Sequence, residues 1–171
     1  MVILNNLSFD EHNIEFLSKS TTLIQFLLIS GYCTYSEISK LSLDILSNIC
    51  SKVILQNLSK LDLNRLFSTI KKLLFSNDRY EMIRGLEIIT KLCQTRDNKE
   101  LLTINLDNDI YEILSELLTV QDFLLLTYGL ECLYQLSQFN EIVCNQLILT
   151  SKSIICKILI SLSLLSLSSL L

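Results

Sequence analysis

The chain has 171 residues, of which 50% are hydrophobic and 19% charged, so it can fill one continuous core and is too apolar to be disordered. It has no proline and only three glycines, a composition that favours an all-α fold over a β-sandwich. The net charge of −4 argues against a protein that coats nucleic acid with its whole surface.

Four short segments are versions of one another and recur at nearly constant spacing. They begin at Ile3, Ile45, Ile88 and Cys132, at successive offsets of 42, 43 and 44 residues, and read ILNNLS, ILSNIC, IITKLC and CLYQLS. A period of this length is typical of armadillo and HEAT repeats. We therefore expect an armadillo-like, right-handed helical solenoid of about three to four such units, which would bind partners along an extended surface.

Apolar periodicity predicts a succession of mostly short helices. In chain order they cover residues 2–7, 10–18, 20–31, 36–55, 62–76, 79–95, 97–104, 108–118, 122–138, 140–148 and 151–166. Capping boxes, in which a Glu follows three residues after the capping residue, predict helix starts at Ser8, Thr34, Asp78, Asp97 and Asp109. The order of short, middle and long helix favours the three-helix armadillo unit over the two-helix HEAT hairpin.

Two glycines, Gly85 and Gly129, fall 44 residues apart on two of the long helices. A glycine inside a helix costs about 1 kcal/mol relative to alanine. Its recurrence therefore predicts close approach of a neighbouring helix.

We expect residues 1–171 to form a single armadillo-like repeat domain, a fragment of a longer solenoid. Within it, residues 154–171 are expected to be an incomplete or uncovered terminal helix. This segment carries one charge, Lys157, so a membrane anchor is the alternative interpretation. Its five serines, and the absence of a basic cluster after it, favour the solenoid helix. An uncovered apolar end predicts that the chain is poorly soluble when expressed alone.

The sequence offers no framework for disulfides, metals or catalysis. It shows no signal-peptide pattern, no C-x-x-C and a single histidine, His12, so we expect reduced cysteines and no metal site. Nucleotide-binding, nucleophile-elbow and metalloprotease motifs are also absent from it. We predict that the protein is not an enzyme and takes no cofactor and no small-molecule substrate.

One set of candidate binding residues follows from the repeat. In peptide-binding armadillo proteins the third helix carries an asparagine ladder that holds the backbone of an extended peptide. The matching positions here are Asn6, Asn48, Lys91 and Gln135. Only two of the four keep asparagine, and the chain has no tryptophan. A generic armadillo peptide-binding protein is therefore a weaker alternative.

A second set of candidates follows from charge. Residues 52–99 hold ten Lys or Arg against five acids, whereas residues 100–149 hold eight acids and no Lys or Arg. The first segment could present a basic stripe that docks an acidic protein partner. The members of this basic stripe are Lys71, Lys72, Arg79, Arg84, Lys91 and Arg96. The alternative is a set of ordinary solvated helix faces.

The run SNDRYEMIRGLEIITKLCQTRDN (76–98) resembles the armadillo-like region of a known family, the AT-rich-interaction-domain subunit of PBAF and RSC-type SWI/SNF chromatin remodellers. The matching pairs are Asp78-Arg79, Arg84-Gly85, Glu87-Ile88, Leu92-Cys93 and Asp97-Asn98. Residues 6–17, residues 25–49 and the segment LECLYQLS are similar to the same family in the same order. The resemblance extends from Asn6 to about Ser163.

The resemblance implies a non-catalytic scaffold or protein-interaction module of a chromatin-remodelling complex, located in the nucleus and bound to other subunits of that complex. The family's AT-rich DNA-binding domain, winged-helix segment and zinc fingers have no counterpart here, so we expect no direct sequence-specific DNA binding. We also expect no membrane association. A membrane-associated helical-repeat adaptor, anchored by residues 154–171, remains the alternative.

Overall fold

The computed structural model describes residues 1–106, 108–118 and 120–137, and every regular element within them is helical. The elements are α1 Val2–Leu7, α2 Glu11–Ser18, α3 Thr21–Ser30, α4 Ser36–Ile49, the 3₁₀ turns η1 Cys50–Lys52 and η2 Leu55–Asn57, α5 Lys60–Leu74, α6 Arg79–Leu92, α7 Arg96–Asn105, α8 Asn108–Leu117 and α9 Phe123–Ser137. The all-α expectation is confirmed for this part of the chain. The predictions for residues 140–148, 151–166 and 154–171 lie outside it.

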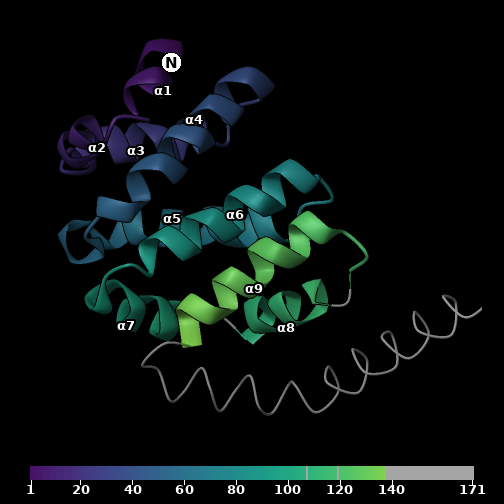
Figure 1. Ribbon diagram of the computed structural model, residues 1–171. Helices are drawn as coiled ribbons and strands as arrows, with labels where there is room; N and C mark the ends of the chain where they lie inside the picture. The colour runs from purple at the N-terminus through teal and green to yellow at the C-terminus, as the bar shows by residue number, and fades with distance from the viewer. Residues whose placement is uncertain (107, 119, 138–171) are drawn as a thin grey trace, which may run out of the picture.

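The helices are arranged in two neighbouring rows (Figure 1). In one row α1 contacts α4, α4 contacts α6, and α6 contacts α9. In the other row α3 contacts α5, and α5 contacts α8. The rows are joined because α3 packs on α4, α5 on α6, and α8 on α9. The four repeat segments all lie in the first row, so the sequence period corresponds to the step from one helix of this row to the next.

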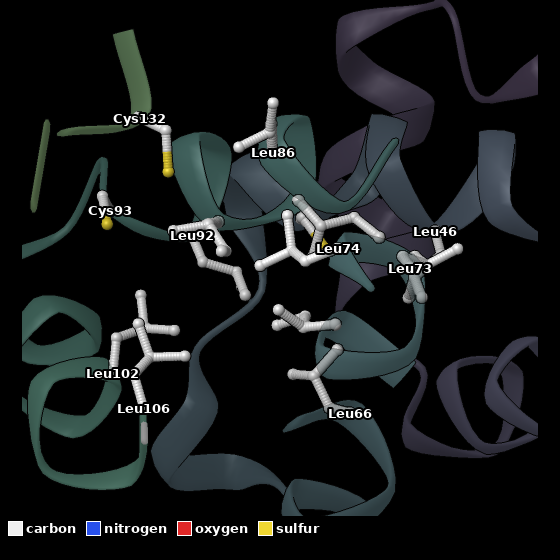
Figure 2. Close-up of a cluster of buried hydrophobic side chains, with 14 of the residues drawn as sticks. Leu46, Leu66, Leu73, Leu74, Leu86, Leu92, Cys93, Leu102, Leu106 and Cys132 are labelled. Atoms are coloured by element: carbon white, nitrogen blue, oxygen red, sulfur yellow. The ribbon is translucent and has the colours of Figure 1, made fainter. Parts of the chain in front are cut away.

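Apolar side chains fill the space between the rows (Figure 2). Ile45, Ile88 and Cys132, which begin three of the repeat segments, are fully buried. Cys50 and Cys93, which end two of them, are buried as well. Burying a side chain such as Leu or Ile contributes about 1.5–3 kcal/mol, so this shared core is the main source of stability. The described cysteines are free thiols.

The prediction of one helix over residues 36–55 is wrong, because α4 ends at Ile49 and two 3₁₀ turns follow. Val53 is extended, with φ −71° and ψ 129°. The side chain of Asn98, which is buried, donates to the Val53 carbonyl over 2.7 Å and accepts from the Leu55 amide over 2.9 Å. These two bonds satisfy backbone groups that a continuous helix would have paired internally.

The helix starts were only partly predictable. Asp78 caps α6 as expected and accepts a hydrogen bond from the Tyr80 amide. The helix starts predicted from the other four capping boxes are wrong. Helix α2 is capped by Asp10 rather than Ser8, and α4 begins after Tyr35 rather than Thr34. Asp97 and Asp109 lie inside the first turns of α7 and α8. Ser20 and Ser59 cap α3 and α5 without a capping box. A serine or aspartate can cap a helix without the reciprocal glutamate.

The two repeated glycines have different surroundings. A Cβ on Gly85 would lie 3.1 Å from Leu73 Cβ and 3.2 Å from Leu74 Cδ2, so α5 and α6 approach each other closely there. A Cβ on Gly129 would lie 3.6 Å from Leu117 Cβ, which is an ordinary contact distance. The predicted close approach is therefore found at Gly85, whereas Gly129 has room for a methyl group.

This difference predicts opposite effects for two chemically identical substitutions. Gly85→Ala should lower the free energy of unfolding by about 1 kcal/mol, since overpacking of about 1–3 kcal/mol exceeds the gain of about 1 kcal/mol in helix propensity. Gly129→Ala should raise it by about 0.5–1 kcal/mol. Urea unfolding followed by circular dichroism measures both, and equal shifts of the same sign would contradict the packing described.

Candidate interaction site

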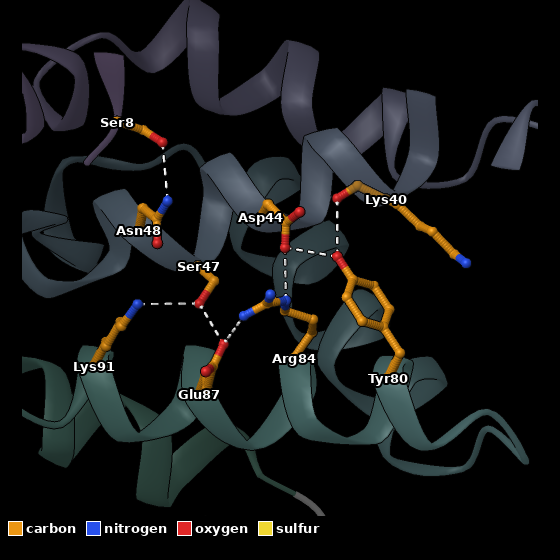
Figure 3. A network of polar contacts seen from close by, with 9 residues as sticks. All are labelled: Ser8, Lys40, Asp44, Ser47, Asn48, Tyr80, Arg84, Glu87 and Lys91. Carbon is orange, nitrogen blue, oxygen red and sulfur yellow. Dashed lines mark hydrogen bonds and ion pairs between the residues drawn. The ribbon is translucent and has the colours of Figure 1, made fainter. Parts of the chain in front are cut away.

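A row of polar side chains on α6 faces α4. Tyr80, Arg84, Glu87 and Lys91 follow one another at intervals of three or four residues, so they share one side of the helix. On α4 the residues that contact them are Asp44 and Ser47, whereas the neighbouring Asn48 contacts Ser8 (Figure 3). Polar contacts thus connect the two helices at the edge of the apolar core.

Arg84 is the centre of this polar network. Its Nε lies 2.7 Å from Asp44 Oδ1, and its Nη1 pairs with Glu87 Oε2. The three side chains are 24%, 22% and 15% exposed, respectively. Burial alone lowers the pKa of the Arg84 guanidinium, but the hydrogen bond with Tyr80 and the Glu87 and Asp44 carboxylates outweigh it and raise the pKa above its ordinary value. Arg84 therefore stays charged and joins α4 to α6.

Tyr80 extends the network toward the start of α4. Its hydroxyl donates to Asp44 Oδ1 over 2.6 Å, and the Lys40 ammonium lies 5.5 Å from the centre of its ring. Burial and the hydrogen bond to Asp44 raise the pKa of Tyr80 to about 12. The neutral phenol is therefore the stabilised form.

The four ladder positions do not form one open row of amides. Asn6 is exposed on α1, whereas the Asn48 amide donates to Ser8 Oγ over 3.0 Å. Lys91 donates to Ser47 Oγ over 3.3 Å, and Gln135 donates to Glu131 of its own helix over 3.0 Å. Two of the four side chains are thus used to join neighbouring helices.

The basic stripe is also divided among intramolecular partners. Lys71 lies 3.0 Å from Asp109 of α8, and Arg79 Nε lies 2.7 Å from Asp122 before α9. Arg96 pairs with Glu100 of its own helix at 3.5 Å. Lys72 is exposed, and its ammonium lies 4.4 Å from the centre of the Tyr32 ring. Four members of the stripe, Lys71, Arg79, Arg84 and Lys91, therefore make contacts outside their own helix. Lys72 is an exposed member that lies beside the Tyr32 ring.

Sequence reasoning did not name four members of the polar network as candidates, namely Asp44, Ser47, Tyr80 and Glu87. Glu87 binds Arg84 and accepts from Ser47 Oγ over 3.1 Å. A signal was present, because Asp44 and Glu87 precede equivalent repeat residues, Ile45 and Ile88. An acid recurring beside a buried position could have indicated contact between the helices.

The described residues contain no group of three or more His, Cys, Asp or Glu side chains placed to hold a metal ion. Among the helices that the structure describes, none has the length and apolar character needed to cross a bilayer. Residues 154–171, the proposed alternative anchor, lie outside these helices.

The position of Tyr80 predicts a pH dependence. Because its pKa is raised on folding, its stabilising contribution is complete below the pKa of the unfolded chain, near 10, and is lost as pH rises through about 12. At pH 8, Tyr80→Phe should lower the free energy of unfolding by about 1–2 kcal/mol through loss of the bond to Asp44. Urea unfolding at pH 8 and pH 11 should show the deficit shrinking at the higher pH, and a constant deficit would refute this role.

Comparison with known proteins identifies relatives of this chain. It is 37% identical over 153 residues to the mouse (Mus musculus) AT-rich interactive domain-containing protein 2, across 90% of this chain and 8% of the mouse protein. It is 29% identical over 154 residues to the Caenorhabditis elegans SWI/SNF chromatin remodeling complex subunit swsn-7, across 89% of this chain and 12% of that protein. No family model matches the chain. The resemblance found in its sequence is confirmed: over nine-tenths of its length the chain is related to one segment of the AT-rich-interaction-domain subunits of PBAF-type SWI/SNF remodellers.

Proposed function

We propose that this chain is a non-catalytic protein-interaction module of a SWI/SNF-type chromatin-remodelling complex of the PBAF and RSC kind, and that it acts in the nucleus. The observation that carries the proposal is the 37% identity across 90% of the chain to AT-rich interactive domain-containing protein 2. The name of the second relative supports it, because swsn-7 is a subunit of a SWI/SNF complex. The partners are then other subunits of such a complex.

We further propose that the module is an armadillo-like, right-handed solenoid. Its support is the row formed by α1, α4, α6 and α9, in which each helix contacts the next and carries one copy of the repeat. The groups α2–α3–α4 and α7–α8–α9 follow the order of an armadillo unit. Between these two groups lies a third, η2–α5–α6, in which the 3₁₀ turn η2 takes the place of the first helix.

The polar network supports a scaffold role rather than a generic peptide groove. Asn48 and Lys91, two of the ladder positions that would hold a peptide backbone, already bind Ser8 and Ser47. Docking of a folded partner on the remaining surface needs no rearrangement of these bonds. Asn6 and Lys72 are the candidate residues with exposed side chains and no contact to an acid among the ion pairs described.

Affinity purification of the tagged chain from nuclear extract, followed by mass spectrometry, tests the proposal. A SWI/SNF-type ATPase and its associated subunits should be recovered in amounts comparable to the chain. The opposite result is a chain that fractionates with carbonate-resistant membranes and recovers no remodelling ATPase.

Charge reversal refines this experiment. Reversing Lys71 or Arg79 also breaks an ion pair with Asp109 or Asp122, so these changes report on stability as well as on docking. Lys72→Glu leaves those ion pairs intact and should reduce recovery of the complex several-fold if the basic stripe docks a partner. Lys60→Glu, at an exposed position at the start of α5, is the matched control. Equal recovery of the complex with both variants would indicate that the basic stripe is an ordinary solvated surface.

A further inference from the structure

A seam between α3 and α5 carries exposed apolar and basic side chains next to one another. At one end of the seam the Gln25 amide donates to Asp62 Oδ2 over 2.8 Å. At the other end the Lys72 ammonium lies 4.4 Å from the centre of the Tyr32 ring. Ile29 lies between these contacts, because it follows Gln25 by one helical turn on the same side of α3. The two helices therefore lie side by side along the seam.

The α3 side of the seam is apolar. Ile29 is 59% exposed, and Phe26, three residues earlier, is 49% exposed. Tyr32, in the turn after α3, is exposed as well. Helix α3 contains no charged residue. Covering these side chains with apolar groups of a partner would remove apolar surface from water and favour binding.

The α5 side of the seam is basic. Arg65 and Lys72 are seven residues apart, so they share one side of the helix and are separated by about 10 Å along its axis. Helix α5 carries four cations and one acid, Asp62. The Asp62 side chain is 2% exposed and accepts hydrogen bonds from Ser59 and Gln25. The acid of this helix is therefore directed into the protein, and the charge that α5 presents to solvent is positive.

Two of these cations remain open to a carboxylate from outside. The Arg65 guanidinium lies 3.7 Å from Asp62 Oδ1, which is longer than a hydrogen bond, and its side chain is 41% exposed. Among the described residues no carboxylate pairs with Lys72, whose ammonium is held beside the Tyr32 ring. Lys71 is not counted in the seam, because it interacts with Asp109 and lies over Phe75.

We propose that the seam binds an acidic amphipathic helix of a partner protein. Carboxylates seven residues apart on this helix pair with Arg65 and Lys72, and an apolar side chain between them packs on Ile29. Charges and apolar anchors at helical spacing are the means by which an amphipathic helix is recognised. Nucleic acid is disfavoured, because its phosphates would meet only two cations and would leave Phe26 and Ile29 uncovered. This inference deepens the proposed function and rests on it, since it names a surface and a partner chemistry for the module.

A direct binding measurement on the full chain tests the seam. The probe is a fluorescein-labelled synthetic peptide of about 18 residues, with glutamates seven residues apart and leucines between them on one side of the helix. A twin carries lysine in place of each glutamate. A third peptide has the same composition as the probe, but its glutamates lie on opposite sides of the helix. Fluorescence anisotropy follows all three at low and high salt, since charge-driven binding weakens as salt rises.

Matched variants of the chain separate the charged from the apolar contribution. Arg65→Gln and Lys72→Gln each remove one cation of the seam, and Lys60→Gln removes an exposed cation on another side of α5. Ile29→Ala shortens the apolar side chain of the seam, and Ile104→Ala shortens one that is 78% exposed on α7. Thermal unfolding of each variant verifies that it is folded.

The acidic probe should bind the unaltered chain, and the basic twin and the rearranged peptide should bind much more weakly. Arg65→Gln and Lys72→Gln should each weaken binding several-fold at low salt, and Ile29→Ala by about tenfold. Lys60→Gln and Ile104→Ala should leave binding of the probe unchanged.

Several results would overturn the inference. They are an acidic probe that does not bind, seam variants that bind it as well as their controls do, and seam variants that alter only the association of the chain with itself. A DNA duplex of about 20 base pairs that binds the seam more tightly than the acidic probe does would also overturn it.

Failure of the inference can be told apart from failure of the proposed function. A chain that recovers the remodelling ATPase but does not bind the acidic probe overturns the seam alone. A chain that binds the probe through the seam but recovers no ATPase overturns the proposed complex and supports the seam chemistry.

Discussion

The packing of α6 against α4, α5 and α9 is the constraint on which the remaining structure depends. Against α5 the helices are so close that Gly85 has no room for a methyl group without movement of Leu73 or Leu74. Against α4 the contact is polar, and the half-buried Arg84 is held by carboxylates of both helices. A half-buried cation left without those carboxylates would be costly, so the pairing also favours one register between the two helices.

This arrangement determines which surfaces remain for partners. The side of α6 that faces α4 is occupied by bonds within the chain, including two of the positions that would form a peptide ladder. A surface left open lies elsewhere, at Lys72 beside Tyr32.

The sequence predicted features that depend on local pattern and missed those that depend on distant partners. Helix α6 and its cap at Asp78 follow from apolar spacing and one side-chain bond. The end of α4 at Ile49 could not be predicted, because the 3₁₀ turns after it are held by Asn98, more than 40 residues away. Arg84 was chosen for its charge alone, and its partner Asp44 became evident only once α4 and α6 were placed side by side.

Native-state hydrogen exchange tests the central position of α6 most directly. Amides buried by several neighbours exchange only through large openings, whereas those at a lightly packed end exchange through local fraying. The amides of residues 86–92 in α6 should therefore be among the slowest to exchange, and those of α1, which has no buried residue, among the fastest. Exchange in α6 as fast as in α1 would contradict the account.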